Sequence, residues 1–145
     1  MANRVRAAVV GVGYLGAFHA DKYASLPDVD LVGVIDASPE RAAEVAAKCG
    51  TRVLPGLDAL PGAVDCVSLA VPTSLHHRLA RQLLEAGIDV LVEKPMTETV
   101  EEGRELVAIA ARGGRILQVG HLERFNPAIR ALADIVRQPR FIECP

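Results

Sequence analysis

The sequence contains few cysteines, and their positions exclude two kinds of site. Cys49, Cys66 and Cys144 have none of the close spacings that mark a metal site or a redox pair. We therefore expect no bound metal. We also expect reduced thiols, as in a cytoplasmic protein, with Cys66 in the core.

The chain also has no large excess of positive or negative charge. The chain has 16 Lys and Arg against 18 Asp and Glu, a net charge of −2, and its basic residues are scattered rather than gathered in a stripe. A nucleic-acid groove needs such a stripe, so we expect no nucleic-acid partner.

Long apolar runs are missing as well. The longest, residues 7–18, is shorter than the roughly 20 residues that span a bilayer. The basic residues before it make it resemble a signal peptide, but its regularly spaced glycines, followed at once by Asp21 and Lys22, favour a strand and a turn. We expect no membrane partner.

Short apolar runs recur along the chain, separated by longer helical patterns. These runs do not alternate polar with apolar residues, which predicts strands covered on both faces, as in parallel sheets. They cover residues 6–10, 31–35, 66–71, 89–92 and 115–119, with a weaker candidate at 52–54.

Helix boundaries are marked between the strands. Ser38 is a candidate N-cap of a helix that ends at Gly50, and Thr99 with Glu102 forms a capping box for a helix that ends near Arg112. Further helices are predicted after the first strand, over 74–86 and over 127–138. The pattern predicts an α/β fold with a doubly wound, mostly parallel sheet.

The domain boundary is expected close to the end of the chain. Residues 1–138 form the predicted dinucleotide-binding Rossmann domain. Residues 139–145 begin to look like a further strand, as at the start of a C-terminal substrate domain.

The stretch "GVGYLG", residues 11–16, follows the first strand and opens the first helix. In this context Gly11 allows a tight turn, Gly13 lets a pyrophosphate approach the backbone, and Gly16 permits close packing of helix on strand. Tyr14 and Leu15 lie between them and are also predicted to contact the cofactor. A glycine-rich turn without a ligand is the alternative.

Asp36 ends the second strand 20 residues after Gly16, at the spacing of a carboxylate that binds adenosine ribose hydroxyls. It would repel the 2′-phosphate of NADP by about 4 kcal/mol at 4 Å, so we expect NAD, with NADP less favoured. Ala37 and Arg41 are further candidates for cofactor contact, and Arg41 would offset part of the repulsion. Alternatively, Asp36 is a simple turn residue.

Other polar residues follow predicted strands and should share the same edge of the sheet, where ligands bind in such folds. Lys94 suits the oxidation of an alcohol, because the oxygen that loses its proton needs a cation or a proton acceptor beside it. A strand-end ion pair between Glu93 and Lys94 is the alternative. The candidates at this edge are Asp36, Pro72 with Thr73, Glu93 with Lys94, and Gly120 with His121.

Four segments resemble the Gfo/Idh/MocA family of NAD(P)-dependent oxidoreductases: "GVGYLGAFHA" (11–20), "VPTSLHH" (71–77), "EKPM" (93–96) and "GHLERFNPA" (120–128). The resemblance implies a two-domain dehydrogenase, of which this chain lacks the second α/β domain and its D-x-x-x-H pair. It matches the family's catalytic lysine to Lys94, implies a cis peptide before Pro95, and places His76 near the cofactor. His76 could equally be a packing or capping residue, and His77 is expected in solvent.

The last segment is similar to a branch that includes bacterial UDP-N-acetylglucosamine 3-dehydrogenases. This implies a sugar or nucleotide-sugar hydroxyl as substrate, with the 3-hydroxyl of UDP-N-acetylglucosamine as one candidate. Lys94, His121, Arg124 and Asn126 are the candidate substrate residues. Arg124 could instead pair with Glu123 or an acid of another domain, and Asn126 could cap a helix.

Two functions of different classes follow from these patterns. One is the NAD-binding part of a sugar dehydrogenase that is a homo-oligomer at full length and turns over little as this chain alone. The other is a dinucleotide-binding or sensing module without turnover. The "EKP" segment favours the first, and it argues against a third candidate, an amino-acid or dihydrodipicolinate type dehydrogenase.

Overall fold

Five parallel strands form one sheet in the order β2-β1-β3-β4-β5. The structure is a computed structural model that describes residues 4–132, 135–137, 141 and 143. The strands are β1 (Val5–Val10), β2 (Val29–Ile35), β3 (Cys66–Leu69), β4 (Asp89–Val92) and β5 (Leu117–Val119). This topology confirms the predicted doubly wound Rossmann fold.

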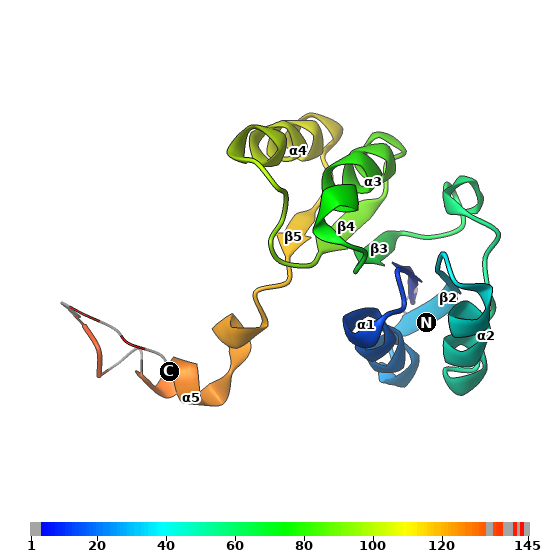
Figure 1. Cartoon of the computed structure of the whole chain (residues 1–145), viewed down its shortest axis with the longest axis horizontal. Helices are drawn as coiled ribbons and strands as arrows, with labels where there is room; N and C mark the ends of the chain where they lie inside the picture. Colours follow the sequence, from blue (N-terminus) through cyan, green and yellow to red (C-terminus); the bar gives the residue numbers. More distant parts are fainter. Residues whose placement is uncertain (1–3, 133–134, 138–140, 142, 144–145) are drawn as a thin grey trace.

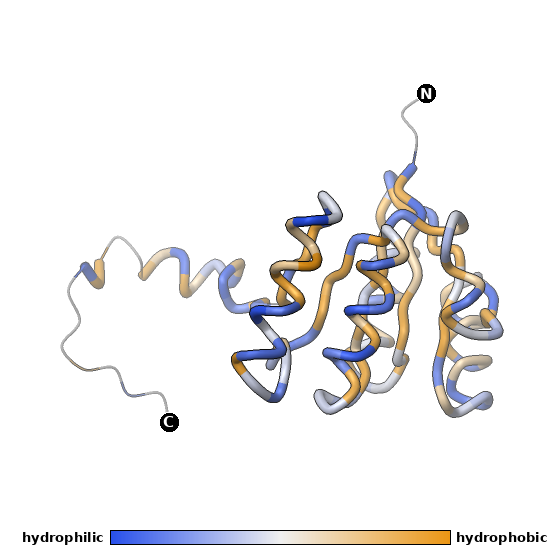
Figure 2. The backbone as a smooth tube through the Cα atoms, turned by 90° about the horizontal axis from the view of Figure 1, so that it is seen from above, coloured by the Kyte–Doolittle hydropathy of each residue, from blue (hydrophilic) through white to orange (hydrophobic). Residues whose placement is uncertain are grey.

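Helices cover both faces of the sheet. In Figure 1, α1 and α2 lie on one side of the strands, and α3 and α4 lie together on the other. The helices are α1 (Tyr14–Ser25), α2 (Pro39–Lys48), α3 (Thr73–Glu85), α4 (Val100–Gly113) and α5 (Pro127–Leu132), with short 3-10 helices η1 (Leu57–Ala59) and η2 (Leu122–Phe125). Beyond β5 the chain runs away from the sheet (Figure 2).

The two faces of the sheet bury separate cores. Along β1, Ala8 and Val10 join the apolar cluster that includes Leu83 of α3 and Leu106 of α4. Val9, between them, joins the cluster on the side of α1 and α2. Because both faces of the strand are buried, the strand has no polar alternation, as the sequence indicated.

The weakest predicted strand, residues 52–54, is reduced to a single bridge between Val53 and Val34 of β2. Pro55 and Gly56 follow at once, and neither residue favours a longer ladder. β5 starts at Leu117, two residues later than predicted, and β3 ends at Leu69, two residues earlier than predicted.

The last predicted helix begins at Pro127 as expected, and its described part reaches Leu132. Residues 135–137 are described and are not helical, so the predicted continuation of the helix to 138 is wrong there. Residues 133, 134 and 138, and most of the domain start predicted for 139–145, lie outside the described residues. Among the described residues, no helix combines the length and apolar character needed to cross a membrane.

The expectation that Cys66 lies in the core was wrong, because it begins β3 and is only partly buried. Burial is nevertheless the main cause that raises the pKa of its thiol. Cys49 is likewise a partly buried free thiol with a raised pKa. Cys144 lies outside the described residues.

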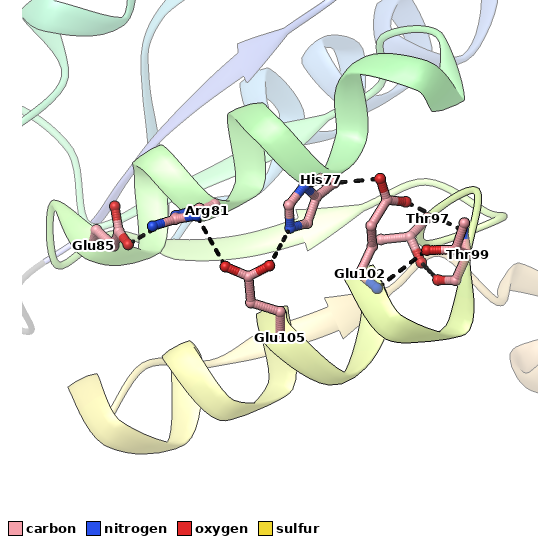
Figure 3. Close-up of polar contacts among 7 residues, drawn as sticks. All are labelled: His77, Arg81, Glu85, Thr97, Thr99, Glu102 and Glu105. Atoms are coloured by element: carbon pink, nitrogen blue, oxygen red, sulfur yellow. Dashed lines mark hydrogen bonds and ion pairs between the residues drawn. The ribbon is translucent and has the colours of Figure 1, made fainter.

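A row of polar contacts joins α3 to α4 (Figure 3). His77 Nε2 lies 3.0 Å from Glu105 and its Nδ1 lies 4.0 Å from Glu102. Arg81 pairs with the same Glu105 at 2.9 Å and with Glu85 at 3.0 Å. The expectation that His77 is solvated was therefore wrong, because α4 brings two carboxylates to the ring.

The predicted capping box starts α4. The hydroxyl of Thr99 accepts a hydrogen bond from the backbone N–H of Glu102, and the Glu102 carboxylate accepts one from the backbone N–H of Thr99, both at 3.2 Å. Two backbone donors that the helix leaves unpaired are thereby satisfied.

We predict that Thr99→Ala lowers the free energy of unfolding by about 1 kcal/mol, the usual cost of a lost N-cap. Urea denaturation measures this loss. The control is Thr99→Ser, which retains the cap oxygen and should lose much less. Equal losses in the two variants would show that the cap hydroxyl does not stabilise α4.

Candidate functional site

The chain reverses its direction across the sheet at β1. It proceeds from β1 to β2 on one side and then crosses to β3 on the other, so the loops after β1 and β3 diverge. Such a switch point at the carboxyl ends of the strands is where open α/β sheets bind ligands. A cleft of about 670 Å³ lies there, and its lining includes Gly11, Gly13, Leu15, Asp36, Arg41 and Pro72.

The three glycines of "GVGYLG" have three different environments. Gly11 has φ +83°, and a Cβ built on it would lie 2.7 Å from the Ala70 carbonyl oxygen. A Cβ on Gly16 would lie 1.8 Å from the carbonyl oxygen of Gly11, so α1 packs directly on the turn. Beside Gly13, no described heavy atom lies within 4 Å of such a Cβ. The space there admits a close-approaching ligand, as predicted from the motif.

The N-terminus of α1 offers an anion site beside this space. Gly13 is the N-cap and has no side chain to occupy the first N–H groups, and the first turn contains no acidic residue. Unpaired N–H groups and the positive end of the helix dipole favour a phosphate at such a position. The residues therefore fit the pyrophosphate of a dinucleotide.

Asp36 is fixed at the edge of the cleft. Its carboxylate accepts hydrogen bonds from the backbone N–H groups of Val12, at 2.7 Å, and Ser38, at 2.8 Å. The guanidinium of Arg41 lies 3.7 Å away. Asp36 thus serves as a turn residue, the alternative considered from sequence, while it and Ala37 also line the cleft. Each carboxylate oxygen retains a lone pair that can accept a further hydrogen bond.

A second hollow, of about 420 Å³, adjoins the first. Leu15 lines both, and the second also includes Glu93, Lys94 and His121. The expectation that residues from separate strand ends line one edge is therefore confirmed for Asp36, Pro72, Glu93, Lys94 and His121. Lys94 is exposed at this edge, whereas Glu93 is only 4% exposed.

The buried carboxylate of Glu93 ends a chain of polar side chains. Its Oε1 lies 2.9 Å from Nε2 of His19 on α1, and Nδ1 of the same ring lies 3.0 Å from the hydroxyl of Ser68 on β3. The Ser68 hydroxyl in turn lies 2.7 Å from that of Tyr23. Burial is the main cause that raises the pKa of Tyr23, and either of the two hydroxyls can be the donor in this contact.

This arrangement differs from the expected alternative of an ion pair between Glu93 and Lys94. The Glu93 carboxylate contacts the His19 ring and the backbone N–H of Lys94, the latter at 3.2 Å. A buried charge that loses its partner typically costs about 3–5 kcal/mol, so the histidine is the structural partner of Glu93. The ammonium group of Lys94 is not needed for this purpose.

Sequence reasoning assigned no role to His19, Ser68 or Tyr23, although two signals were present. Leu15, His19 and Tyr23 recur at intervals of four and therefore share one face of α1. Ser68 is a lone hydroxyl within a buried apolar strand, and buried polar groups need partners. Together these signals predict a polar contact between the helix and the strand.

His76 is fully enclosed, at 1% exposure. Its Nδ1 lies 2.9 Å from the carbonyl oxygen of Pro95, and its Nε2 lies 2.9 Å from that of Val71. The ring thus joins the loop after β4 to the loop after β3, which is the packing role considered from sequence. Its contact with a cofactor stays a prediction. The Lys94–Pro95 peptide is cis, as the resemblance implied.

Besides Gly16 and His76, two predicted cofactor residues, Tyr14 and Thr73, lie outside the lining of both hollows. Tyr14 is 82% exposed, and its ring packs edge-on against Phe18 with centroids 5.2 Å apart. Thr73 begins α3, directly after Pro72 of the cleft. For both residues, contact with the cofactor stays a prediction.

The candidate substrate residues beyond β5 are spread out. His121 lines the hollow with Lys94 and also a groove along β5 that includes Arg124. The Oδ1 of Asn126 accepts a hydrogen bond from Ala128 N–H at 2.9 Å, so this residue caps α5. Its amide also donates to the Glu123 carboxylate at 2.7 Å, the group considered as a partner for Arg124.

Acidic, histidine and cysteine side chains do not gather into a metal site in the part of the chain that the structure describes. The groups that the structure places at the strand ends include a helix N-terminus, a fixed carboxylate and an exposed lysine.

Comparison with known proteins gives a consistent picture. Residues 5–121 match an oxidoreductase family with an NAD-binding Rossmann fold, Gfo/Idh/MocA. The chain is 44% identical to UDP-N-acetylglucosamine 3-dehydrogenase of Acidithiobacillus ferrooxidans over 140 residues, which cover 96% of this chain and 44% of the relative. It is 35% identical to inositol 2-dehydrogenase 1 of Saccharopolyspora erythraea, with 97% and 45% covered.

Solved structures agree with these relatives. The Acidithiobacillus ferrooxidans enzyme superposes with a TM-score of 0.86 at 43% identity, with 92% of this chain and 44% of that one covered. GenD2 from gentamicin A biosynthesis, in complex with NAD, superposes with a TM-score of 0.90 at 32% identity and coverage of 95% and 40%. The chain thus spans less than half the length of the relatives it matches.

We predict effects of very different size for alanine at two glycines of the glycine motif. Gly16→Ala should lower the free energy of unfolding by about 3 kcal/mol or more, because the new methyl meets backbone that cannot move away. Gly13→Ala should cost about 1 kcal/mol or less, because its methyl enters open space. Urea denaturation compares the two variants, and equal losses would contradict the assigned geometry.

Proposed function

This chain belongs to the Gfo/Idh/MocA oxidoreductase family, with an NAD-binding Rossmann fold, and on that basis we propose that it forms the NAD-binding part of a dehydrogenase. The proposed reaction transfers a hydride between the nicotinamide and a secondary hydroxyl of a sugar or nucleotide sugar. The observation that carries the proposal is the exposed Lys94 in a hollow that adjoins the glycine-lined cleft.

Different residues of the cleft bind different parts of the dinucleotide. The N–H groups at the start of α1 bind the pyrophosphate, for which Gly13 leaves room. The Asp36 carboxylate accepts hydrogen bonds from the adenosine ribose hydroxyls. Because Asp36 marks the adenosine end and Leu15 connects the two hollows, the nicotinamide end is at Glu93, Lys94 and His121.

Lys94 supplies the group needed at the reacting oxygen. A nicotinamide held at this end would supply the hydride acceptor for oxidation and the hydride donor for reduction. In alcohol oxidation, the Lys94 amine takes the hydroxyl proton or, as an ammonium, stabilises the negative charge that develops on oxygen. In the reverse direction it returns the proton. Positioning of this kind contributes about 10² to 10⁴ in rate.

For the substrate we propose a nucleotide sugar oxidised at its 3-hydroxyl, with UDP-N-acetylglucosamine as the first candidate. Support comes from the 44% identity to an enzyme named for that reaction. His121 is the nearest further contact for the sugar, since it shares the hollow with Lys94. Arg124 and Asn126 are assigned more distant substrate contacts. We also propose a cytoplasmic homo-oligomer for the full-length protein.

We predict that the chain binds NAD at least about tenfold more tightly than NADP. The Asp36 carboxylate repels a 2′-phosphate by about 4 kcal/mol at 4 Å, and the nearby Arg41 offsets part of this. Isothermal titration calorimetry measures both affinities. Asp36→Asn should reduce the ratio of NAD affinity to NADP affinity, and Arg41→Ala should increase it. Tighter binding of NADP by the wild type would contradict the role of Asp36.

We predict that Lys94→Met lowers kcat about 10² to 10⁴-fold in the protein expressed from the complete reading frame. NADH formation from UDP-N-acetylglucosamine and from inositol is followed at saturating NAD. NAD affinity should change less than about threefold, because pyrophosphate and ribose contacts remain. A wild type that binds NAD but oxidises no sugar or inositol would favour the sensing module, and an active Lys94→Met variant would remove the lysine from the mechanism.

A further inference from the structure

We propose that His19 is a positioning residue for Lys94 and that it acts through the carboxylate of Glu93. The effect on the cofactor rests on the proposed function, whereas the effect on the position of Lys94 does not. Nothing in the glycine motif requires a histidine at this place. The geometry of three separate elements, α1, β3 and the end of β4, carries the assignment.

The Glu93 carboxylate connects the ring to the lysine. Its Oε1 accepts the hydrogen bond from His19 Nε2 at 2.9 Å, and its Oε2 accepts the one from the backbone N–H of Lys94 at 3.2 Å. A single rigid group therefore joins α1 to the peptide from which the Lys94 side chain departs. Movement of the carboxylate necessarily removes the acceptor of this N–H.

The carboxylate is held from two further directions. A Cβ built on Gly120 would lie 2.8 Å from Glu93 Oε1, so the backbone after β5 closes that side. The His19 ring is itself held at Nδ1 by the hydroxyl of Ser68, at 3.0 Å, and Ser68 is fully buried in β3. Tyr23 holds the same hydroxyl at 2.7 Å. The ring is thus anchored to the sheet and aimed at Glu93.

The expected consequence is local to one end of the site. Without the Nε2 contact, the buried Glu93 carboxylate lacks one of its hydrogen-bond donors and must turn toward another donor or toward solvent, because a buried polar group without a partner is unfavourable. The loop that carries Lys94 then shifts. The contacts of Asp36 with Val12 and Ser38 lie at the other end and are untouched.

Two substitutions of His19 distinguish the effect of its hydrogen bond to Glu93 from the effect of its packing. The side-chain amide of glutamine extends about as far as Nε2, so His19→Gln retains a donor for the Glu93 carboxylate. The shorter amide of asparagine corresponds to Nδ1, so His19→Asn retains only the partner of Ser68. Both variants are polar and neutral, and their melting temperatures are measured first to check that both are folded.

The first measurement follows the Lys94 backbone amide by hydrogen exchange in the ligand-free chain. It should exchange at least about tenfold faster in His19→Asn than in the wild type, and less than threefold faster in His19→Gln. A similar rate in all three proteins would overturn the positioning role.

The second measurement compares NAD with ADP-ribose, which lacks only the nicotinamide. His19→Asn should weaken NAD binding about tenfold and ADP-ribose binding less than twofold, and His19→Gln should restore the NAD affinity. Equal weakening of both ligands, or equal behaviour of the two variants, would overturn the proposal. A wild type that binds neither NAD nor ADP-ribose refutes the proposed function instead. The exchange rates of the Lys94 backbone amide in the three proteins then still decide whether His19 positions Lys94.

Discussion

The packing of α1 on the turn after β1 sets the position of the groups that α1 contributes to the site. Gly16 lies so close to the Gly11 carbonyl that a methyl group between them would stand 1.8 Å from the oxygen. This approach brings the N–H groups of the first helical turn to the cleft. It also fixes the rotation of α1, so that Leu15 faces both hollows while His19, one turn later, reaches Glu93. A packing constraint at one glycine thereby determines an electrostatic contact at the far end of the site.

The loop that carries Lys94 is held from both faces of the sheet. On the side of α1, His19 holds the Glu93 carboxylate, and on the side of α3, His76 contacts the carbonyl oxygen of Pro95. Both rings are nearly enclosed, and both have a second partner on or next to β3, Ser68 for His19 and the Val71 carbonyl for His76. Polar contacts on two sides of a buried ring restrict the orientation of the ring. An exposed lysine consequently starts from a well-defined backbone.

Local signals in the sequence were sufficient for much of this structure. The glycine motif predicted three distinct roles, the capping box of Thr99 formed as expected, and β4 has the predicted bounds, Asp89–Val92. Contacts between elements were not predictable in the same way. His77 meets Glu102 and Glu105 only because α3 and α4 pack together. Likewise, the partners of His19 depend on which side of β3 and β4 faces α1, a property of strand register and helix rotation that no single segment encodes.

The pairing of Glu93 with His19 explains why an acid can adjoin the lysine without neutralising it. If the Glu93 carboxylate were to bind the neighbouring ammonium, the lysine would be oriented toward the core and its charge would be shared with a strong acceptor. The buried carboxylate instead receives its hydrogen bonds from the His19 ring and from the backbone N–H of Lys94. The proposed reaction uses neither of these donors. At the opposite end, Asp36 is held by two backbone N–H groups. In both places fixed protein donors orient the carboxylate. Lys94 beside Glu93 stays exposed, and the Asp36 carboxylate retains lone pairs for a ligand.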